Sequence, residues 1–446
     1  MGTAHRPTAG RSIVSAGPDM AHIAVIGAGI TGVTTAYSLL ERGHSVTVFE
    51  RHRYPAMETS FANGGQLSVS NAEVWNSPAT LLKGLKWMFD AAAPLSLSLR
   101  PSWHKYSWLA EFVAQIPHYR KNTLATVRLA LEARRQLFAV AQKEGIEFDL
   151  EKRGILHVYR DRAGFEHASR VNDLLNEGGL DRRAVTPAEI KSIESTLAGD
   201  YYGGFFTPSD STGDIHKFTT ALAAACERRG ARFVCDANVD TVTVNDGGVT
   251  IDWHRNDASE SEQTRADAVI VCAGVASRAF GAMLGDRINV YPVKGYSITV
   301  ELDDEKSRAS APWVSLLDDE AKIVTSRLGE GRLRVAGTAE FAGFNRDIRA
   351  DRVLPLTDWT RAMFPGVSTE RVVPWAGLRP MMPNMLPRVG AGRRARVFYN
   401  TGHGHLGWTL AAATAELVAE AVGRGLRGVT APGVATFPGR PASAAG

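Results

Sequence analysis

The sequence predicts a mixed α/β protein with more than one domain, and three observations carry this prediction. The chain has 446 residues, roughly three times the length of an ordinary domain. A strand–helix–strand pattern of about thirty residues, typical of a parallel sheet, begins at His22. Further strand patterns at 268–272 and 397–400 lie far from this unit in the chain. We therefore expect one domain to be assembled from separate segments.

Composition and charge exclude several classes of protein. With 44% hydrophobic and 22% charged residues, the chain has the composition of a globular protein. A formal net charge of +4, spread along the chain, disfavours a nucleic-acid partner. The three cysteines lack metal-ligand spacing, so we expect neither a metal site nor a disulfide framework, and a cytoplasmic location is indicated. No apolar run reaches the ~20 residues of a membrane helix, and residues 1–19 read as a disordered leader.

The first unit shows each of its elements in order. His22–Ile26 is a short apolar strand, and Val33–Arg42 carries apolar residues at helical spacing. Gly43 provides the left-handed stop of this helix, and Val46–Phe49 forms a second strand. The first strand and the helix are joined by Gly27-Ala28-Gly29-Ile30-Thr31-Gly32. In this context the Gly-x-Gly-x-x-Gly motif predicts a Rossmann-like nucleotide-binding unit.

The glycines and the acid that follows the second strand have separate roles in nucleotide binding. Gly27 permits the tight turn, Gly29 lets the backbone approach a pyrophosphate, and Gly32 lets the helix pack closely on the strand. The helix N-terminus offers unpaired N–H groups to phosphate. Glu50 stands where a carboxylate accepts hydrogen bonds from ribose hydroxyls and disfavours a 2′-phosphate, so FAD or NAD is expected. The contacts expected here are Ile26, Gly27, Ala28, Gly29, Ile30, Thr31, Gly32, Glu50 and Arg51.

The rest of the pattern mixes helices and strands. Residues 109–144 read as helical, and Asp214 is the expected N-cap of a helix that ends at Arg229. Strand patterns on both sides of the turn Asp246-Gly247-Gly248 predict a hairpin. The predicted strands are 154–159, 233–235, 239–244, 249–253, 268–272, 298–303, 332–336 and 397–400, and a final helix covers 408–422.

Two later segments favour FAD over NAD. Asp267–Gly274 is a buried strand closed by small residues, which suits a second segment of one discontinuous nucleotide domain. Asn400–Gly407 is a strand–loop–helix whose glycines and helix N-terminus can hold the pyrimidine edge of a flavin and stabilise negative charge on the reduced ring. An NAD enzyme needs no such C-terminal cradle, so the expected cofactor is FAD. Its further expected contacts are Ser60, Asn63, Gly64, Gly65, Gln66, Val239, Ala273, Gly274, Gly402, His403, Gly404, Leu406 and Gly407.

Six blocks along the chain carry a family resemblance. They are Glu58-Thr59-Ser60-Phe61-Ala62-Asn63-Gly64-Gly65-Gln66, Lys86-Trp87-Met88, Thr212-Gly213-Asp214, Tyr291-Pro292-Val293-Lys294-Gly295-Tyr296-Ser297, Gly377-Leu378-Arg379-Pro380-Met381 and Asn400-Thr401-Gly402-His403-Gly404. On these blocks the chain resembles the FAD-dependent D-amino-acid dehydrogenases of the small-subunit type, within the D-amino-acid oxidase and glycine oxidase superfamily. The resemblance runs in the order of that family from about residue 22 to 424.

The resemblance implies a domain organisation. It implies a discontinuous, Rossmann-like FAD-binding domain and a substrate domain built on an antiparallel sheet. The FAD-binding domain is expected at 20–83, 207–288 and 373–430, the substrate domain at 84–206 and 289–372, and a flexible tail at 431–446.

The resemblance also implies a reaction, the oxidative deamination of D-amino acids to 2-oxo acids and ammonia. A hydride leaves Cα for flavin N5, and the electrons pass to a quinone or another respiratory acceptor. Arg379 is the residue expected to pair its planar guanidinium with the substrate carboxylate. Tyr296 is a candidate second donor to that carboxylate, and the alternative is a half-buried core tyrosine.

Three positions depart from the family pattern on the substrate side. Met382-Pro383-Asn384-Met385 stands where the family usually has Thr-Pro-Asp-Gly. His405 replaces a frequent threonine, and Ser211 replaces a frequent acid. Two alternatives stay open: an O2-using amine or amino-acid oxidase of the glycine or sarcosine type, and a flavin-binding protein without turnover.

Residues 75–108 combine tryptophans with lysine and arginine. Aromatic and cationic side chains suit the surface of a membrane, so this stretch predicts a peripheral contact with the inner face of the cell membrane, near a quinone. The alternative is that these residues pack within the substrate domain.

Overall fold

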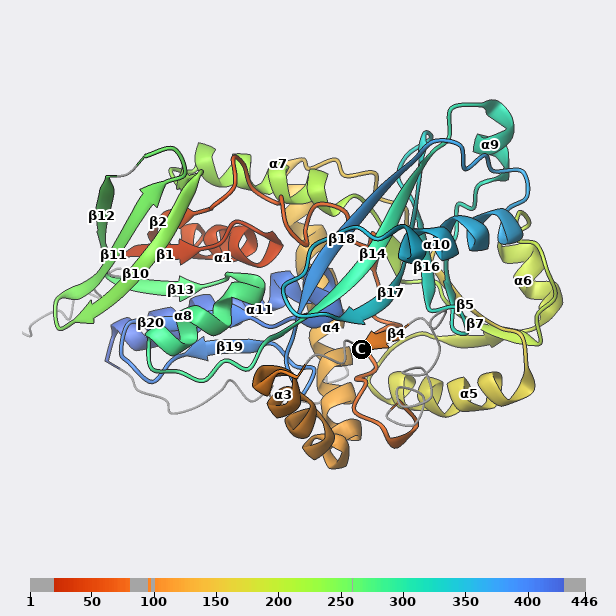
Figure 1. Cartoon of the computed structure of the whole chain (residues 1–446), viewed down its shortest axis with the longest axis horizontal. Coiled ribbons are helices and arrows are strands. Elements are labelled where there is room, and N and C mark those ends of the chain that lie inside the picture. The colour runs from red at the N-terminus through yellow and green to blue at the C-terminus, as the bar shows by residue number, and fades with distance from the viewer. Residues whose placement is uncertain (1–19, 81–94, 98–100, 259, 429–446) are drawn as a thin grey trace, which may run out of the picture.

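The computed structural model describes residues 20–80, 95–97, 101–258 and 260–428. The expected leader at 1–19, the expected tail at 431–446 and the block Lys86-Trp87-Met88 lie outside the described residues. The described chain forms two sheet regions that lie side by side (Figure 1).

A six-stranded sheet occupies one side of the molecule, on the left of Figure 1. Its strand order is β19-β20-β13-β1-β2-β9, and its neighbours are parallel except for the antiparallel pair β19–β20. The strands are β1 (His22–Ile26), β2 (Ser45–Phe49), β9 (Arg232–Val234), β13 (Ala268–Val271), β19 (Arg388–Ala391) and β20 (Val397–Thr401). Segments that are far apart in the sequence thus meet in one sheet.

The alternation of side chains along β1 explains how the two faces of this sheet are covered. Ile23 and Val25 are buried in one cluster with four helices, and Ala24 and Ile26 are buried in another cluster with a small antiparallel sheet. The helices are α1 (Ile30–Leu40), α4 (Tyr119–Glu144), α7 (Ile215–Arg228) and α11 (Gly407–Leu426). The small sheet consists of β10 (Ala237–Asn245), β11 (Gly248–Arg255) and β12 (Ser261–Ala266).

A nine-stranded sheet forms the other side of the molecule, in the order β18-β14-β17-β16-β15-β5-β7-β6 with β4 paired to β17. Its pairs are antiparallel except for β15–β5 and β17–β4. The strands are β4 (Leu95–Leu97), β5 (Ile155–Tyr159), β6 (Arg183–Val185), β7 (Gly203–Thr207), β14 (Tyr291–Glu301), β15 (Ser315–Asp318), β16 (Ile323–Arg327), β17 (Arg332–Phe341) and β18 (Val372–Met381). A separate short pair joins β3 (Gln66–Leu67) to β8 (Ser211–Thr212).

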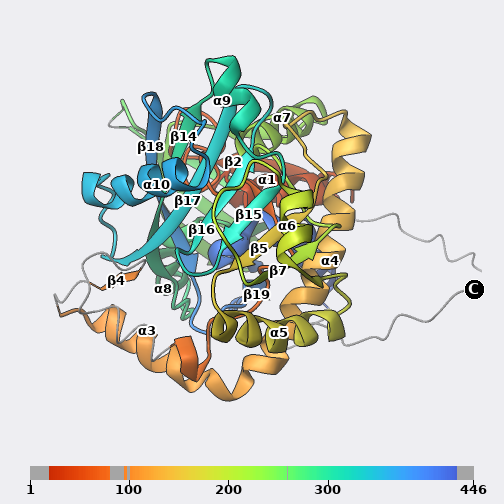
Figure 2. The same cartoon turned by 90° about the vertical axis from the view of Figure 1, so that its right-hand side faces the viewer.

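Further helices pack around the two sheet regions. α6 and α10 share a buried cluster with one of its faces, whereas α3 and α5 lie below the sheets in both views (Figures 1 and 2). The bounds are α3 (Trp103–Ala114), α4 (Tyr119–Glu144), α5 (Arg162–Glu177), α6 (Pro187–Ile193), α8 (Ser277–Met283), α9 (Glu305–Ser310) and α10 (Ala350–Met363). None of the helices in the described part of the chain combines the length and the apolar character needed to cross a membrane.

The predicted fold class, a mixed α/β fold with a Rossmann-like unit and a second, antiparallel sheet, is confirmed. The first strand has the predicted bounds, and Gly43 follows α1 with φ +82°. The carboxylate of Asp214 caps α7 as predicted, because it accepts hydrogen bonds from the N–H groups of His216 and Lys217 at 2.9 and 3.1 Å.

Three elements differ from their predicted extent. The helix expected at 109–144 is two helices, because the short turn Ile116–His118, which contains Pro117, separates α3 from α4. The strands expected at 298–303 and 332–336 are the longer β14 and β17. The domain boundary expected at 373 falls inside β18, which pairs with β14 along its whole length. The division into domains stays a prediction.

Candidate active site

A cavity of about 660 Å³ lies where the carboxyl ends of β1, β2, β13 and β20 face the large sheet. Ligands of open α/β sheets bind at this edge, and the volume suits a small-molecule site. Arg379 and Tyr296 line the cavity. The expected cofactor contacts that line it are Ile26, Gly27, Gly29, Ile30, Thr31, Glu50, Arg51, Ser60, Asn63, Gly64, Gly65, Gln66, Val239, Ala273, Gly274, Gly402, His403, Gly404, Leu406 and Gly407.

The glycine-rich turn brings α1 against β1 with no side chain between them. Gly27 has φ +103°, a conformation that favours glycine. A Cβ at Gly32 would lie 1.8 Å from the carbonyl oxygen of Gly27, so only glycine fits there. Ala28 is buried and donates its N–H to Glu50. Ala28 and Gly32 do not line the cavity, because both are turned into the packing that shapes the turn, and their expected contact with the cofactor stays a prediction.

Glu50 and Ser60 form hydrogen bonds with backbone N–H groups beside the N-terminus of α1. Glu50 is 7% exposed, and its two carboxylate oxygens accept hydrogen bonds from the N–H groups of Ala28 at 2.8 Å and His52 at 3.0 Å. Ser60 Oγ accepts a hydrogen bond from the N–H of Ile30, the first residue of α1, at 3.0 Å. A carboxylate and a helix N-terminus therefore face the same cavity.

The segment 63–66 lies directly on the large sheet. Gly65 has φ +72°, and a Cβ there would lie 2.8 Å from Cβ of Ser326 on β16. The Ser326 hydroxyl donates to the carbonyl oxygen of Gly64 at 2.7 Å. The two glycines therefore let the backbone cross the sheet at contact distance, and they leave its other side open to the cavity.

His403 is a buried residue of the loop between β20 and α11. It is 3% exposed, pairs through its backbone with Met381, and places Nε2 2.9 Å from Oγ1 of Thr414. Burial lowers the pKa of His403 to about 3. This imidazole is therefore neutral at pH 7, and the loop adds no positive charge to the cavity here.

His405 and Trp408 carry buried polar atoms that lack a partner. His405 Nε2 lies 3.3 Å from the carbonyl oxygen of Asn71, so Nε2 carries the proton, and the ring stacks on Trp75 with centroids 4.8 Å apart. Burial lowers the pKa of His405 to about 4. Its Nδ1 and the Nε1 of Trp408 have no hydrogen-bond partner among the described residues, although both residues line the cavity. Such atoms indicate a missing ligand, and the polar edge of a flavin fits them.

Arg379 presents a guanidinium to the cavity from β18. The side chain lies flat on Gly295 of β14, where a Cβ would be 2.3 Å from Nη2. Nη1 donates to the carbonyl oxygen of Thr338 at 3.1 Å. Among the described residues no carboxylate lies within ion-pair distance of it, and burial lowers its pKa to about 10. The guanidinium is therefore available to an anion that enters the cavity.

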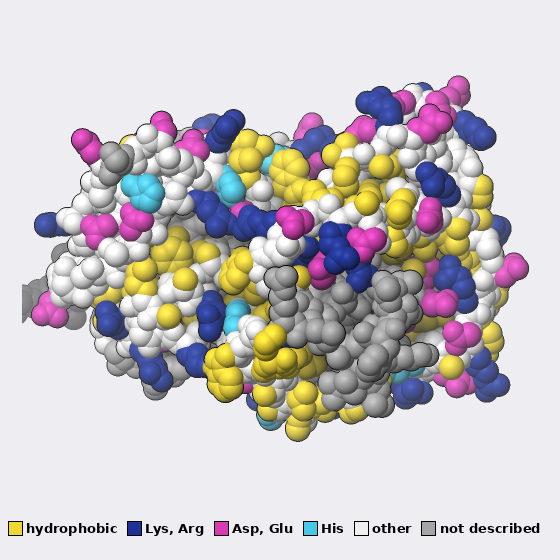
Figure 3. Space-filling view, in the orientation of Figure 1, with side chains coloured by type: hydrophobic (Ala, Val, Ile, Leu, Met, Phe, Trp, Pro, Cys, Tyr) yellow, Lys and Arg dark blue, Asp and Glu magenta, His cyan; other side chains and the backbone are white. Residues whose placement is uncertain are grey.

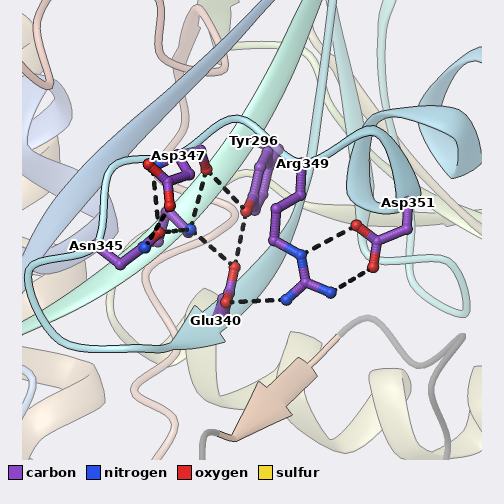
Figure 4. A network of polar contacts seen from close by, with 7 residues as sticks. Tyr296, Glu340, Asn345, Asp347, Arg349 and Asp351 are labelled. Atoms are coloured by element: carbon purple, nitrogen blue, oxygen red, sulfur yellow. Dashed lines mark hydrogen bonds and ion pairs between the residues drawn. The ribbon is translucent and has the colours of Figure 1, made fainter.

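The hydroxyl of Tyr296 belongs to the polar network of Figure 4. It donates to Oε2 of Glu340 at 2.7 Å, and the same oxygen lies 3.1 Å from Nζ of the fully buried Lys294. Lys294 also donates to Oδ1 of Asn345 at 2.6 Å and to the carbonyl oxygen of Asp347 at 3.1 Å. The hydroxyl proton expected to reach a substrate carboxylate is thus given to Glu340, so we do not propose that role for Tyr296.

Replacing Lys294 with methionine is expected to destabilise the protein by up to ~3 kcal/mol, because the buried Glu340 would keep only the half-exposed Arg349, at 3.4 Å, as a cationic partner. Burial raises the pKa of Glu340, but hydrogen bonds from Tyr296 and Lys294 reverse this and hold it below its ordinary value. The Lys294–Glu340 pair therefore stabilises the fold at pH values above the ordinary pKa of a glutamate. The difference in thermal unfolding midpoint between wild type and variant should narrow as the pH falls below about 4.

The matched control for this variant is Arg371→Met. Arg371 pairs with Asp303 at 2.6 Å, but the two side chains are 70% and 53% exposed. Loss of such a pair costs less than about 1 kcal/mol. Equal shifts of the unfolding midpoint in the two variants would show that the buried network contributes no more to stability than an exposed ion pair.

The residues at 382–385, which depart from the family pattern, preserve the local backbone geometry. Met385 stands where the resemblance has glycine, and it adopts φ +62°, the conformation that glycine favours. The side-chain oxygen of Asn384 accepts a hydrogen bond from the N–H of Leu386 at 3.2 Å and supports this turn. A Cβ at Gly402 would lie 2.5 Å from Cγ of Met382, so this methionine packs on the C-terminal loop. Nothing in the structure explains the serine at 211.

Several cavity residues were missed by the sequence reasoning. His157 and Tyr159 line the cavity from β5, where their two-residue spacing places them on one face of the strand. This two-residue spacing within a predicted strand could have identified both residues as candidates from the sequence. Arg182 also lines the cavity but lies in the loop before β6, where no pattern marks it.

The chain is similar to curated proteins and to solved structures along most of its length. It is 64% identical over 403 residues to D-amino acid dehydrogenase 3 of Mesorhizobium japonicum, with 90% of this chain and 97% of that protein covered. It is 41% identical over 411 residues to D-amino acid dehydrogenase of Paramagnetospirillum magneticum, with coverage of 90% and 94%. The crystal structure of glycine oxidase from Geobacillus kaustophilus matches with a TM-score of 0.71 at 22% identity, covering 91% of this chain and 95% of that one, which shows a shared fold.

The family model named FAD dependent oxidoreductase, DAO, matches residues 22–421. This range begins at the first strand of the six-stranded sheet and ends within α11, so it includes the whole cavity. The family resemblance described above is thereby confirmed, and so is FAD as the cofactor. The chain belongs to the family of FAD-dependent oxidoreductases.

Proposed function

We propose that the protein is a D-amino acid dehydrogenase, which converts D-amino acids to 2-oxo acids and ammonia. The observation that carries this proposal is the guanidinium of Arg379, which faces the cavity and has no anionic partner among the described residues. A planar guanidinium in this state pairs with a carboxylate. The names of the curated relatives support an amino acid of D configuration as the molecule that brings the carboxylate.

Different residues around the cavity suit the ribose, the pyrophosphate and the flavin ring of FAD. Glu50 would accept hydrogen bonds from the ribose hydroxyls, and the turn at Gly29 with the N-terminus of α1 would bind the pyrophosphate. Segment 63–66 and the loop 402–407 would hold the flavin ring, with Nδ1 of His405 as one available acceptor. When bound, FAD supplies the two-electron acceptor that takes the hydride from the substrate Cα.

The protein contributes mainly by positioning the substrate. Arg379 holds the α-carboxylate in a fork, which fixes the direction of the Cα–H bond. Positioning of this kind can lower a barrier by about 7–11 kcal/mol. The substrate reacts with its amine neutral, and His403 and His405, which are themselves neutral at pH 7, place no positive charge beside it. The imino acid then reacts with water to give the 2-oxo acid and ammonia.

Anaerobic mixing with paired D- and L-amino acids tests this function. D-amino acids should bleach the band of the oxidised flavin, and their L-enantiomers should not. Reduction by glycine or sarcosine, with one peroxide formed per turnover in air, would favour an oxidase instead. A panel in which no amino acid bleaches the flavin would favour a binding protein without turnover.

We also propose that the electrons pass to a quinone or another respiratory acceptor, as the word dehydrogenase in the names of the relatives suggests. Turnover of D-alanine in air should then be slow without an added acceptor and fast with a soluble quinone. Oxygen uptake that matches the full rate of turnover would contradict this part of the proposal.

Helix α3 offers a surface for the proposed contact with the inner face of the cell membrane. Trp103, Tyr106 and Val113 are 82%, 49% and 41% exposed and form one stripe along the helix. Figure 3 shows hydrophobic side chains gathered in the region of α3. An exposed stripe with tryptophan and tyrosine suits the interface of a lipid bilayer.

The double variant Trp103→Ser, Tyr106→Ser should bind lipid vesicles at least ~10-fold more weakly than wild type, since each buried side chain contributes about 1.5–3 kcal/mol. Co-sedimentation with anionic vesicles measures the effect, and activity with a soluble acceptor should not change. Val373→Ser is the control, because Val373 is equally apolar and 57% exposed but lies on β18. No vesicle binding by the wild type would end this proposal.

A further inference from the structure

Residues 62–64 are hydrogen-bonded to the large sheet through three consecutive carbonyl oxygens. Ser297 Oγ, on β14, donates to the first of them at 2.8 Å. Arg334 Nη1, on β17, donates to the second at 3.1 Å, and Ser326 Oγ, on β16, donates to the third at 2.7 Å. Ser326 and Arg334 are cross-strand partners, and Ser297 lies opposite Ala336, which follows Arg334 on the same face of β17. The three donors therefore lie on one face of the sheet.

These three hydrogen bonds set the direction of the peptide N–H groups. In a trans peptide group the N–H points opposite to the carbonyl, and the described chain has no cis peptide bond. Because the carbonyls point to the sheet, the N–H groups of Asn63, Gly64 and Gly65 point away from it, on the side of the cavity that these residues line. The N–H of Gly65 donates to Oδ1 of Asn63 at 2.9 Å. Those of Asn63 and Gly64 have no acceptor among the described residues, so two donors are available to a ligand.

Arg334 is the charged donor among the three. It is 6% exposed, and burial lowers its pKa to about 10, so it keeps its charge at pH 7. Of the charges that act on it, the largest is that of Asp214, which lies 2.9 Å from Arg332 instead. Its Nε has no hydrogen-bond partner in the described part of the chain. A buried cation without an ion pair costs free energy to keep, and the hydrogen bond that this one makes goes to the segment that lines the cavity.

The arrangement suits a ligand that becomes negatively charged. Reduction of a flavin adds two electrons and one proton, so one negative charge remains on the ring. Successive backbone N–H groups form a site for such charge, and donors that are already fixed need no reorientation when it appears. Because Arg334 does not itself line the cavity, its effect on a ligand must pass through residues 62–64 and through its charge behind them.

Resting on the placement of the flavin ring proposed above, we infer that Arg334 is a positioning residue of the FAD site. It fixes the peptide groups of residues 62–64, so that the N–H groups of Asn63 and Gly64 face the ring, and it thereby stabilises the reduced form of the cofactor. Ser297 and Ser326 hold the carbonyls on either side of the one that Arg334 holds.

The reduction potential of bound FAD tests this inference, because a residue that only supports the fold leaves it unchanged. Arg334→Gln should lower the ratio of reduced to oxidised flavin at a fixed potential at least ~10-fold, which is about 30 mV for a two-electron couple. Arg334→Lys keeps the charge and one donor, so a loss of no more than about threefold is expected. Titration with dithionite against a reference dye measures the ratio. An unchanged ratio in Arg334→Gln would overturn the inference.

Arg327→Gln is the matched control. Arg327 is 1% exposed and donates to backbone carbonyls, as Arg334 does. It follows Ser326 on β16 and so faces the other side of the sheet, and none of its acceptors lines the cavity. This variant should unfold earlier than wild type and keep the flavin ratio of wild type. An equal change of the ratio in the two variants would assign the effect to lost stability and would overturn the inference.

Two measurements keep the inference testable if Arg334→Gln does not fold. Ser326→Ala removes an uncharged donor to the same segment and should lower the flavin ratio by about threefold. In the wild-type holoenzyme, reduction by dithionite should slow amide hydrogen exchange at Asn63 and Gly64 at least ~3-fold and leave Gly65 unchanged, since its N–H is already bonded. An unchanged ratio in Ser326→Ala, or exchange that reduction does not alter, would overturn the inference. Failure of the proposed function looks different, since dithionite then still reduces the flavin but no D-amino acid does.

Discussion

Replacing Arg379 with alanine is expected to lower kcat/KM for a D-amino acid by ~100–1,000-fold, mainly through KM, and to leave the flavin spectrum unchanged. A bidentate pair of charge-assisted hydrogen bonds contributes about 3–4 kcal/mol, and each 1.4 kcal/mol corresponds to a factor of ten. The guanidinium has one protein acceptor, the carbonyl of Thr338, so its removal leaves little else unpaired. Steady-state kinetics together with the absorption spectrum of the purified variant measure both effects.

Two further variants distinguish the effect of the charge of Arg379 from the effect of its position and planar shape. Arg379→Lys keeps the charge and loses the planar fork, so an intermediate loss of about tenfold is expected. Gly295→Ala keeps the arginine but places a Cβ 2.3 Å from its Nη2, which must displace the guanidinium. It should therefore raise KM without removing any donor. An unaltered KM in Arg379→Ala would remove Arg379 from the substrate site.

Gly32→Ala is expected to abolish stable FAD binding, so that the purified variant carries less than about a tenth of the cofactor of wild type. The new Cβ would lie 1.8 Å from the carbonyl oxygen of Gly27, and α1 must move away from the turn to avoid it. The N–H groups at its N-terminus would then no longer meet the pyrophosphate. The ratio of flavin to protein absorbance and the unfolding midpoint with added FAD measure the result.

Gly423→Ala in α11 is the matched control. A Cβ there meets no atom closer than 3.6 Å, and alanine is the better helix residue by about 0.5–1 kcal/mol. This variant should bind FAD fully and unfold slightly later than wild type. A Gly32→Ala protein with full FAD content and an unchanged midpoint would refute the packing argument for the third glycine.

The elements that could be predicted from the sequence are those whose determinants lie within a few residues. The bounds of β1 follow from five consecutive residues, His22–Ile26, and the cap of α7 follows from the carboxylate of Asp214 three residues or fewer from the N–H groups it accepts. The break between α3 and α4 also has a local cause, Pro117, which helical spacing of apolar residues hides.

The ends of the long strands could not be predicted because their partners decide them. β17 continues to Phe341 past Thr338, which has φ +56°, beside a shift of register in its pairing with β14. Such a bulge depends on neighbouring strands that are distant in the sequence. It also matters for the site, because the carbonyl of Thr338 is the acceptor that orients Arg379.

The sequence by itself determined the nucleotide-binding unit, its glycines and Glu50, because the chemistry of each follows from residue type and local spacing, and its family resemblance pointed to the arginine of the cavity. Only the tertiary structure decided which side chains face the cavity. It directs the Tyr296 hydroxyl to Glu340 and brings Arg182 in from a loop. The physical reason is that side chains of a strand alternate between two faces, and the register with neighbouring strands decides which of these faces encloses the ligand.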